Sequence, residues 1–183
     1  MNYDEIVSET ADKMAKGVTH FQDEIRGLRS GRATPAMVEN LRVEAYGSPT
    51  PLNQLASIAI PEPRSLLIKP YDQSILKDIE KAIQVSDLGI NPQSDGKVVR
   101  LTVPDMSEEQ RTKMVSRIKD LSEAAKISLR NIRRDLNKRS DESKELTEDD
   151  VKSAKDEIQK ILKASEGEIE TLFKAKTHEI MET

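Results

Sequence analysis

The sequence predicts an α+β protein, in which three long helices form an elongated bundle and a small β/α/β domain is inserted after the first helix. Three long segments repeat apolar residues every three or four positions, which is typical of amphipathic helices. Between the first and second of them lies a stretch of short alternating runs punctuated by Gly and Pro, which indicates strands and turns. We place the bundle domain at residues 1–30 and 105–183, and the inserted domain at residues 31–104.

The first predicted helix runs from Tyr3 to Arg29. Its apolar residues step mostly by three and four, so at about 100° per residue they form one stripe along the helix. The stripe consists of Ile6 or Val7, Ala11, Met14, Val18, Phe21, Ile25 and Leu28.

The inserted domain begins where helical periodicity stops, at Ser30 to Pro35. Predicted strands lie at 41–46, 58–60, 66–68 and 98–103, turns at 47–51, 61–63 and 95–96, and one helix at 74–85. Two short connections, near 30–32 and 104–107, join this domain to the bundle. Such a pair of connections is a natural hinge.

Two further helices complete the predicted bundle. The second begins at Ser107, which forms a capping-box pattern with Gln110. The third begins near Thr147, where three acidic residues fill the first turn and suit the positive end of the helix dipole. Its apolar stripe consists of Val151, Ala154, Ile158, Ile161 or Leu162, Ile169, Leu172 and Ile180. Three matching stripes predict a bundle.

The second helix carries a concentration of positive charge. Ten basic and three acidic residues lie between Arg111 and Arg139, a local balance of +7 in a chain of net charge -4. The apolar stripe of this helix consists of Ile118, Leu121, Ala125, Leu129, Ile132 and Leu136. Beside it on the helical wheel lies a basic face, formed by Lys119, Lys126, Arg130 and Arg133, with Arg134 slightly further round.

This basic face fits two interpretations. Most charged helix faces are solvated and bind nothing, but such faces normally alternate acids with bases. Here only Glu123 lies at the margin, and arginine, whose planar fork binds phosphate oxygens, dominates the stretch 130–134. The stretch from Asp141 to Thr183 has a balance of -6. A polyanion would then orient the molecule with its basic side inward, but the acidic stretch is equally explained as complementary charge between neighbouring helices.

Composition excludes several classes of protein. The chain has 183 residues and no Cys, which excludes disulfides and thiolate chemistry and is compatible with a reducing compartment. Its N-terminal residues, MNYDEIVSET, lack the cations and apolar run of a signal peptide, and no stretch approaches a membrane span. We therefore expect a cytoplasmic protein without membrane contact.

Catalytic and cofactor motifs are also missing from the sequence. Neither His20 nor His178 has a second His or a set of carboxylates at ligand spacing, and no phosphate-binding or nucleophile-elbow motif occurs. The acids at 148–150 are explained as first-turn residues of a helix. We expect no enzymatic activity, no catalytic residue, no metal and no cofactor.

Five motifs in register resemble bacterial ribosome recycling factor. They are LRSGRA at 28–33, YGSPTPL at 46–52, QLAS at 54–57, DLGINP at 87–92 and LRNIRRD at 129–135. The resemblance covers essentially the whole chain. It implies an L-shaped molecule similar to a transfer RNA, which binds the post-termination ribosome as a monomer. With elongation factor G and GTP hydrolysis, members of this family separate the ribosomal subunits and release mRNA and tRNA.

The resemblance also implies roles for individual residues. In this family the bundle contacts large-subunit ribosomal RNA through the motif that here contains Arg130 and Arg133, so we assign rRNA binding to these two. Lys126, Arg32 and Arg111 are added as further rRNA-binding residues. The hinge role falls to four residues at the two connections, namely Ser30, Gly31, Pro104 and Asp105.

Two other function classes remain open at this point. A coiled-coil adaptor would bind a protein partner through its long helices, and it predicts exposed apolar positions on the bundle and association that is insensitive to salt. A hydrolase or transferase is disfavoured because the sequence has no paired catalytic groups. RNA binding, in contrast, predicts a closed core and steep salt dependence.

Overall fold

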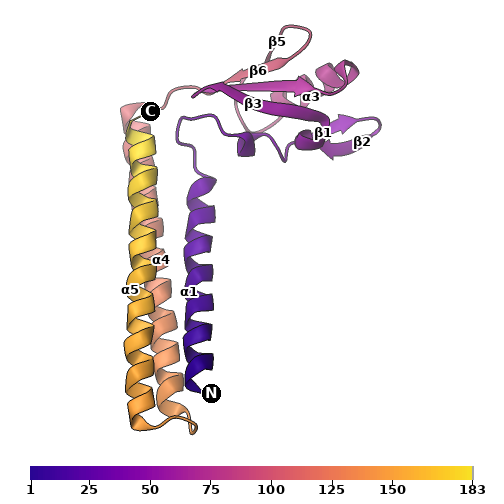
Figure 1. Cartoon of the computed structure of the whole chain (residues 1–183). Coiled ribbons are helices and arrows are strands. Elements are labelled where there is room, and N and C mark those ends of the chain that lie inside the picture. Colours follow the sequence, from indigo (N-terminus) through magenta and orange to yellow (C-terminus); the bar gives the residue numbers. More distant parts are fainter. Residues whose placement is uncertain (183) are drawn as a thin grey trace. The chain divides into compact units, whose positions relative to one another are not determined.

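The computed structural model describes residues 1–182 of this chain (Figure 1). The chain folds into two compact units. One unit combines Met1–Ser30 with Glu108–Glu182, and the other comprises Gly31–Ser107. Each unit has a hydrophobic core of its own. Each can therefore be described as a separate folded body.

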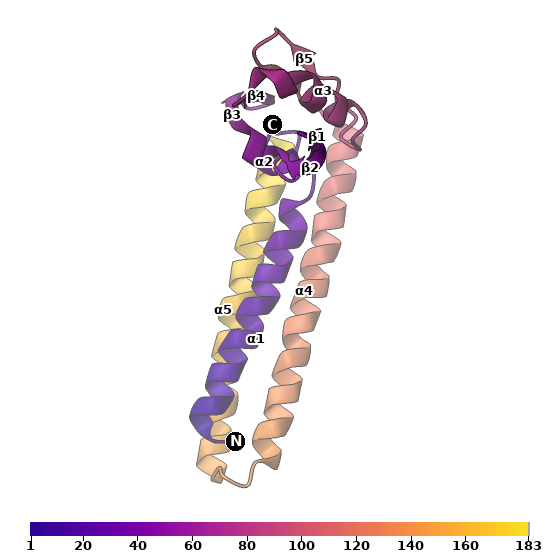
Figure 2. The same cartoon turned by 90° about the vertical axis from the view of Figure 1, so that its right-hand side faces the viewer.

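The helical unit is a bundle of α1 (Tyr3–Arg26), α4 (Glu108–Glu142) and α5 (Glu148–Met181). The three helices run side by side in both views, and each contacts the other two (Figures 1 and 2). The predicted bundle is therefore confirmed. Its buried core consists of Ile6, Met14, Val18, Phe21, Ile25, Ile118, Leu129, Leu136, Ala154, Ile158, Leu162, Ile169 and Ile180.

The helix ends follow local sequence signals. Thr147 caps α5, and its hydroxyl accepts from the backbone N–H of Asp150 at 3.2 Å, as the sequence predicted. Asn2 and Glu5 form a capping box at the start of α1, which is not among the predicted caps. The first helix ends at Arg26 rather than at the predicted Arg29, because Gly27 is a poor helix former and takes the cap position.

A glycine allows α1 and α4 to approach closely. A Cβ atom added to Gly17 would lie 3.0 Å from the Cδ2 atom of Leu129 on α4. That separation is shorter than an ordinary carbon contact, so any larger residue at this position would displace the Leu129 side chain. Gly17 thus brings the α1 backbone against the centre of the core.

The other unit is built on a four-stranded antiparallel sheet in the order β3-β4-β6-β5. These strands are β3 (Ala56–Glu62), β4 (Ser65–Pro70), β5 (Gln93–Ser94) and β6 (Val99–Thr102). One helix, α3 (Leu76–Gln84), follows a short 3₁₀ turn at Gln73–Ile75, close to the predicted 74–85. The core side chains of β4 and β6 pack with those of α3, namely Leu66, Ile68, Val99, Leu101, Leu76, Ile79, Ala82 and Ile83.

A two-stranded ribbon of β1 (Arg42–Ala45) and β2 (Ser48–Pro51), followed by the short α2 (Leu52–Leu55), completes this unit. The sequence predicted β1 but assigned β2 to a turn, and that assignment is wrong. Pro49 and Pro51 have no backbone N–H, so only Ser48 and Thr50 of this strand can donate hydrogen bonds to β1. Because successive residues of a strand direct their backbone groups to opposite edges, the nitrogens of the two prolines face the outer edge of the ribbon. Prolines are compatible with such an edge strand, although they suggested a turn.

The turn of this ribbon requires positive φ angles at both of its central residues. Tyr46 has φ 53° and Gly47 has φ 81°, a combination that matches the right-handed twist of a tight hairpin. Tyr46 is not a glycine, and its conformation is supported by its hydroxyl group, which donates to the carboxylate of Asp72. This hydrogen bond also holds the pKa of Asp72 below its usual value.

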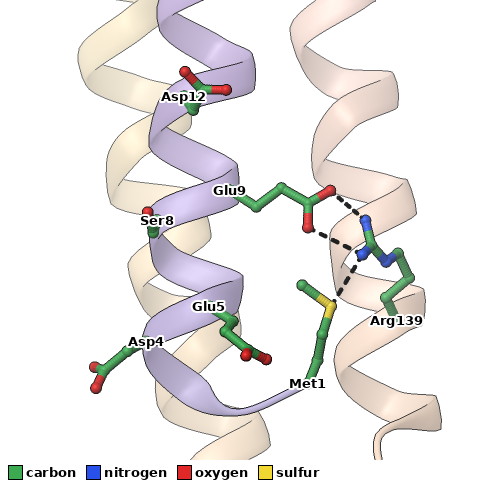
Figure 3. A pocket seen from close by; sticks show the side chains of 7 residues that line it. All are labelled: Met1, Asp4, Glu5, Ser8, Glu9, Asp12 and Arg139. Carbon is green, nitrogen blue, oxygen red and sulfur yellow. Dashed lines mark hydrogen bonds and ion pairs between the residues drawn. The ribbon is translucent and has the colours of Figure 1, made fainter.

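An ion pair links the N-terminal part of α1 to α4. Both Nη atoms of Arg139 donate to the carboxylate of Glu9, and Nη2 also contacts the sulfur of Met1 (Figure 3). Lys13 lies 2.8 Å from the same carboxylate. Arg139 first, and Lys13 second, hold the pKa of Glu9 at about 2, well below the ordinary 4.5.

This ion pair predicts a pH-dependent stability. Because folding lowers the pKa of Glu9, its contribution is present above about pH 4.5 and is lost as pH falls toward 2. We expect Glu9→Gln to lower the free energy of unfolding by about 1 kcal/mol at pH 7, since the pair is partly exposed. Urea unfolding of both chains at several pH values measures the difference. A difference that stays constant from pH 7 to pH 2 would contradict this assignment.

Candidate nucleic-acid interface

The apolar stripe of α4 fixes the direction of its basic face. Ile118, Leu129 and Leu136 are completely buried, and the other three predicted stripe residues are partly buried against the same core. The predicted stripe is therefore confirmed. Since the basic face lies beside this stripe on the helix, it must border one of the two neighbouring helices.

Three residues of the basic face contact α5. Lys126 Nζ lies 3.1 Å from Glu170 Oε2, and Arg130 Nε lies 3.2 Å from Glu166 Oε1. Arg133 Nη1 donates to Gln159 Oε1 at 3.1 Å. These three cations therefore line the seam between α4 and α5.

The pattern of α4 predicts that the guanidinium groups of Arg130 and Arg133, on either side of Asn131, project together toward solvent without intramolecular carboxylate partners, and this prediction is wrong for Arg130. Lys126 has a second acid nearby, Glu123 at 3.9 Å, and its side chain is only 18% exposed. Arg130 is 47% exposed despite its contact with Glu166. The acids of α5 could not be recognised from the pattern of α4 alone, because that pattern does not reveal which residues of another helix lie opposite.

Two further cations of the basic face are exposed, although neither is among the predicted rRNA-binding residues. Within residues 1–182, the side chains of Lys119 and Arg134 make no hydrogen bond or ion pair with another side chain or with the backbone. Arg134 follows Arg133 directly and points about 100° further round the helix. The signal that could have identified it was its position on the outer side of the basic face, away from the core.

Two predicted rRNA-binding residues, Arg111 and Arg32, are not part of this group. Arg111 is fifteen positions before Lys126, about 22 Å along the helix at ~1.5 Å per residue. Its Nη1 lies 3.4 Å from the carbonyl oxygen of Met181. Arg32 is exposed and belongs to the other unit. The structure thus groups three of the five predicted residues, Lys126, Arg130 and Arg133.

The four predicted hinge residues lie at the two connections between the units. The hydroxyl of Ser30 donates to Glu179 Oε1 of α5 at 2.8 Å, which fixes it to the helical unit. Gly31 has φ 81°, a conformation that other residues rarely adopt. Asp105 forms an ion pair with Arg64 inside the sheet unit, and Pro104 beside it is exposed.

Other kinds of site receive no support from the described residues. His20 and His178 are exposed on helices, and each pairs with an acid one turn away, Glu24 and Glu182 respectively. No group of three or more His, Asp and Glu side chains within residues 1–182 is arranged to hold a metal ion. None of the helices in the same range has the length and apolar character that crossing a membrane requires.

Comparison with known proteins identifies the family. Residues 21–181 match the family described as "Ribosome recycling factor". The chain is 45% identical over 181 residues to the ribosome-recycling factor of Symbiobacterium thermophilum, which covers 97% of this chain and 98% of the relative.

Two solved structures are also similar. A solution structure of the ribosome recycling factor has a TM-score of 0.80 and 37% identity, and covers 100% of this chain and 99% of its own. A second has a TM-score of 0.65 and 39% identity, covering 98% and 99%. It belongs to models of the T. thermophilus ribosome recycling factor and the E. coli elongation factor G bound to the E. coli post-termination complex. Sequence and fold agree along almost the entire length, so this chain belongs to the ribosome recycling factor family.

Proposed function

We propose that this chain binds the post-termination ribosome and acts with elongation factor G and GTP hydrolysis to separate its subunits, releasing mRNA and tRNA. Family membership supports the proposal, as does the 39% identical relative described as bound to a post-termination complex with elongation factor G. The family comprises translation factors that are not enzymes, so the chain acts by binding and movement. We propose that it does so in the cytoplasm and as a monomer.

The observation that best supports the RNA contact is the row of cations on the basic face of α4. Arg130 and Arg133 lie one turn apart beside α5, and Arg134 follows on the exposed side. Guanidinium groups so placed can bind successive phosphates of an RNA backbone, which fixes position and orientation rather than base sequence. We propose large-subunit rRNA as the partner. Arg111, Lys126 and Arg32 are proposed as further contacts.

We propose that the two connections act as the hinge that elongation factor G drives. Two residues beside them are anchored in their own units, Ser30 by Glu179 and Asp105 by Arg64. The rotation is therefore absorbed at Gly31, directly after the Ser30 anchor, and between the Asp105 anchor and the start of α4 at Glu108, with Pro104 bordering this second connection. Gly31 is suited to this role because glycine crosses regions of backbone conformation that other residues avoid.

The adaptor alternative loses support from the distribution of apolar side chains. In the described part of the bundle, the large apolar side chains that are exposed are Ile127 and Met181. They lie on different helices, α4 and α5. Such isolated residues do not make the continuous apolar surface that a protein partner would cover.

Co-sedimentation with vacant ribosomes across a salt series tests the RNA contact. Three phosphate contacts predict that binding falls about fortyfold between about 50 and 200 mM salt. Binding that is independent of salt would contradict the proposal.

Subunit splitting with elongation factor G and GTP tests the hinge in the same preparation. Gly31→Ala is expected to retain ribosome binding and slow splitting, and unchanged splitting would remove Gly31 from the hinge.

A further inference from the structure

The cations of the basic face differ in how far neighbouring residues on α4 and α5 compensate their charge. Lys126 has carboxylates on two sides, Glu123 and Glu170, and is mostly buried. Arg130 has one carboxylate, Glu166, on its Nε atom, and about half of its side chain stays exposed. Compensation therefore decreases from Lys126 to Arg130.

The decrease continues toward the C-terminal end of α4. Arg133 is held by the neutral amide of Gln159, which orients the guanidinium without cancelling its charge. The side chain of Arg134 has no hydrogen bond or ion pair within residues 1–182. Over the nine residues from Lys126 to Arg134, the number of paired carboxylates thus falls from two to one and then to none.

The contribution of α5 to this gradient comes from three residues on one edge of the helix, whereas Glu123, the second carboxylate beside Lys126, belongs to α4 itself. Gln159, Glu166 and Glu170 are separated by seven and four positions, so they lie on the same side of the helix. The amide and the two carboxylates all present oxygen acceptors, but only the carboxylates reduce the positive potential at the cation they contact. Whether a position on this edge is Gln or Glu therefore decides how much positive potential the contacted α4 cation presents to a ligand.

We infer that this edge of α5 determines which α4 cations bind RNA phosphate. Glu170 compensates the charge of Lys126, and Glu166 lowers the positive potential at Arg130. Gln159 orients Arg133 without compensating its charge. This inference rests on the proposed RNA contact and deepens it. It concentrates phosphate binding at Arg133 and Arg134. It also makes Lys126 the weakest of the proposed phosphate contacts on this face, because two carboxylates compensate its charge.

Two isosteric substitutions of opposite sign test the inference. Gln159→Glu places a carboxylate beside Arg133 and is expected to lower ribosome affinity about fivefold, the upper range for an exposed ion pair. It should also reduce the slope of log K against log salt by up to about 0.9, one phosphate contact. Glu166→Gln frees Arg130 and is expected to raise affinity about threefold with a steeper slope. Co-sedimentation with vacant ribosomes across a salt series measures both quantities.

Matched controls separate this effect from net charge and from folding. Gln22→Glu on α1 and Glu168→Gln on another side of α5 make the same charge changes away from the α4 edge, and both should bind nearly as the unmodified chain does. Gln159→Glu should not lower the melting temperature, because it exchanges a hydrogen bond for an ion pair. A loss of affinity with unchanged stability therefore reflects competition for Arg133.

The outcomes distinguish the inference from the proposal beneath it. If Arg133→Ala weakens binding but Gln159→Glu binds like the unmodified chain, the role of the α5 edge is wrong and the RNA contact stands. If Arg133→Ala itself binds normally, the docking face is wrong, and the inference is wrong with it. Equal effects of Gln159→Glu and Gln22→Glu would also overturn the inference, because net charge would then explain both.

Discussion

Replacing Arg133 by alanine is expected to lower the affinity for vacant ribosomes at least about tenfold. A charged hydrogen bond to phosphate contributes about 1.5–3 kcal/mol, and one factor of ten corresponds to about 1.4 kcal/mol. Arg133 is the cation that α5 orients without a carboxylate, so its full charge is available to a ligand. The loss should be accompanied by a salt slope smaller by about one unit, because one phosphate contact disappears.

The measurement is co-sedimentation across a salt series, with circular dichroism to compare helix content. Alanine favours helix, so α4 should remain intact in the variant. Arg117→Ala is the matched control, since Arg117 is an exposed arginine on α4 that points about 160° away from Arg133. Equal affinities of the two variants would show that the basic face of α4 does not bind the ribosome through Arg133.

Replacing Phe21 by alanine is expected to lower the free energy of unfolding of the bundle by about 3–5 kcal/mol. Phe21 is completely buried, and it is one of only two phenylalanines in the chain. It lies in the core that α1 shares with α4 and α5, which is built mainly from aliphatic side chains. Its removal leaves a cavity that Leu, Ile and Val neighbours on three helices cannot fill without moving.

Thermal and urea unfolding followed by circular dichroism measure this change. The two units have separate cores, so the variant should melt in two steps, with the helical signal lost first. Phe21→Leu is the control, because it retains most of the buried volume and should cost less than about 1.5 kcal/mol. A loss of under about 1 kcal/mol for Phe21→Ala would mean that the core relaxes around the cavity.

Much of the fold could be predicted because the periodicity of a helix is written in its own sequence. The stripe of α4 identified which side is buried, and Thr147 marked the start of α5. The β2 strand was missed for a physical reason. Prolines normally argue against a strand, and only pairing with β1 explains how Pro49 and Pro51 are accommodated at an edge.

The candidate site was predictable only in part. The pattern of α4 identified Arg130 and Arg133 as neighbours on one face, and the structure places both beside α5. The contacts of Glu166 with Arg130 and of Gln159 with Arg133 could not be predicted, because they depend on how α4 and α5 are aligned. That alignment is set by packing between residues some 26 to 36 positions apart, which a single-helix pattern does not contain.

The prolines of β2 also affect how copies of this chain meet one another. An exposed strand edge normally offers N–H groups to which a strand from another molecule can bond, and this is a common start of aggregation. On the outer edge of β2, both positions that would donate are proline rings. The ribbon therefore cannot be extended by regular strand addition on that side, which protects the small unit from intermolecular β-pairing at high concentration.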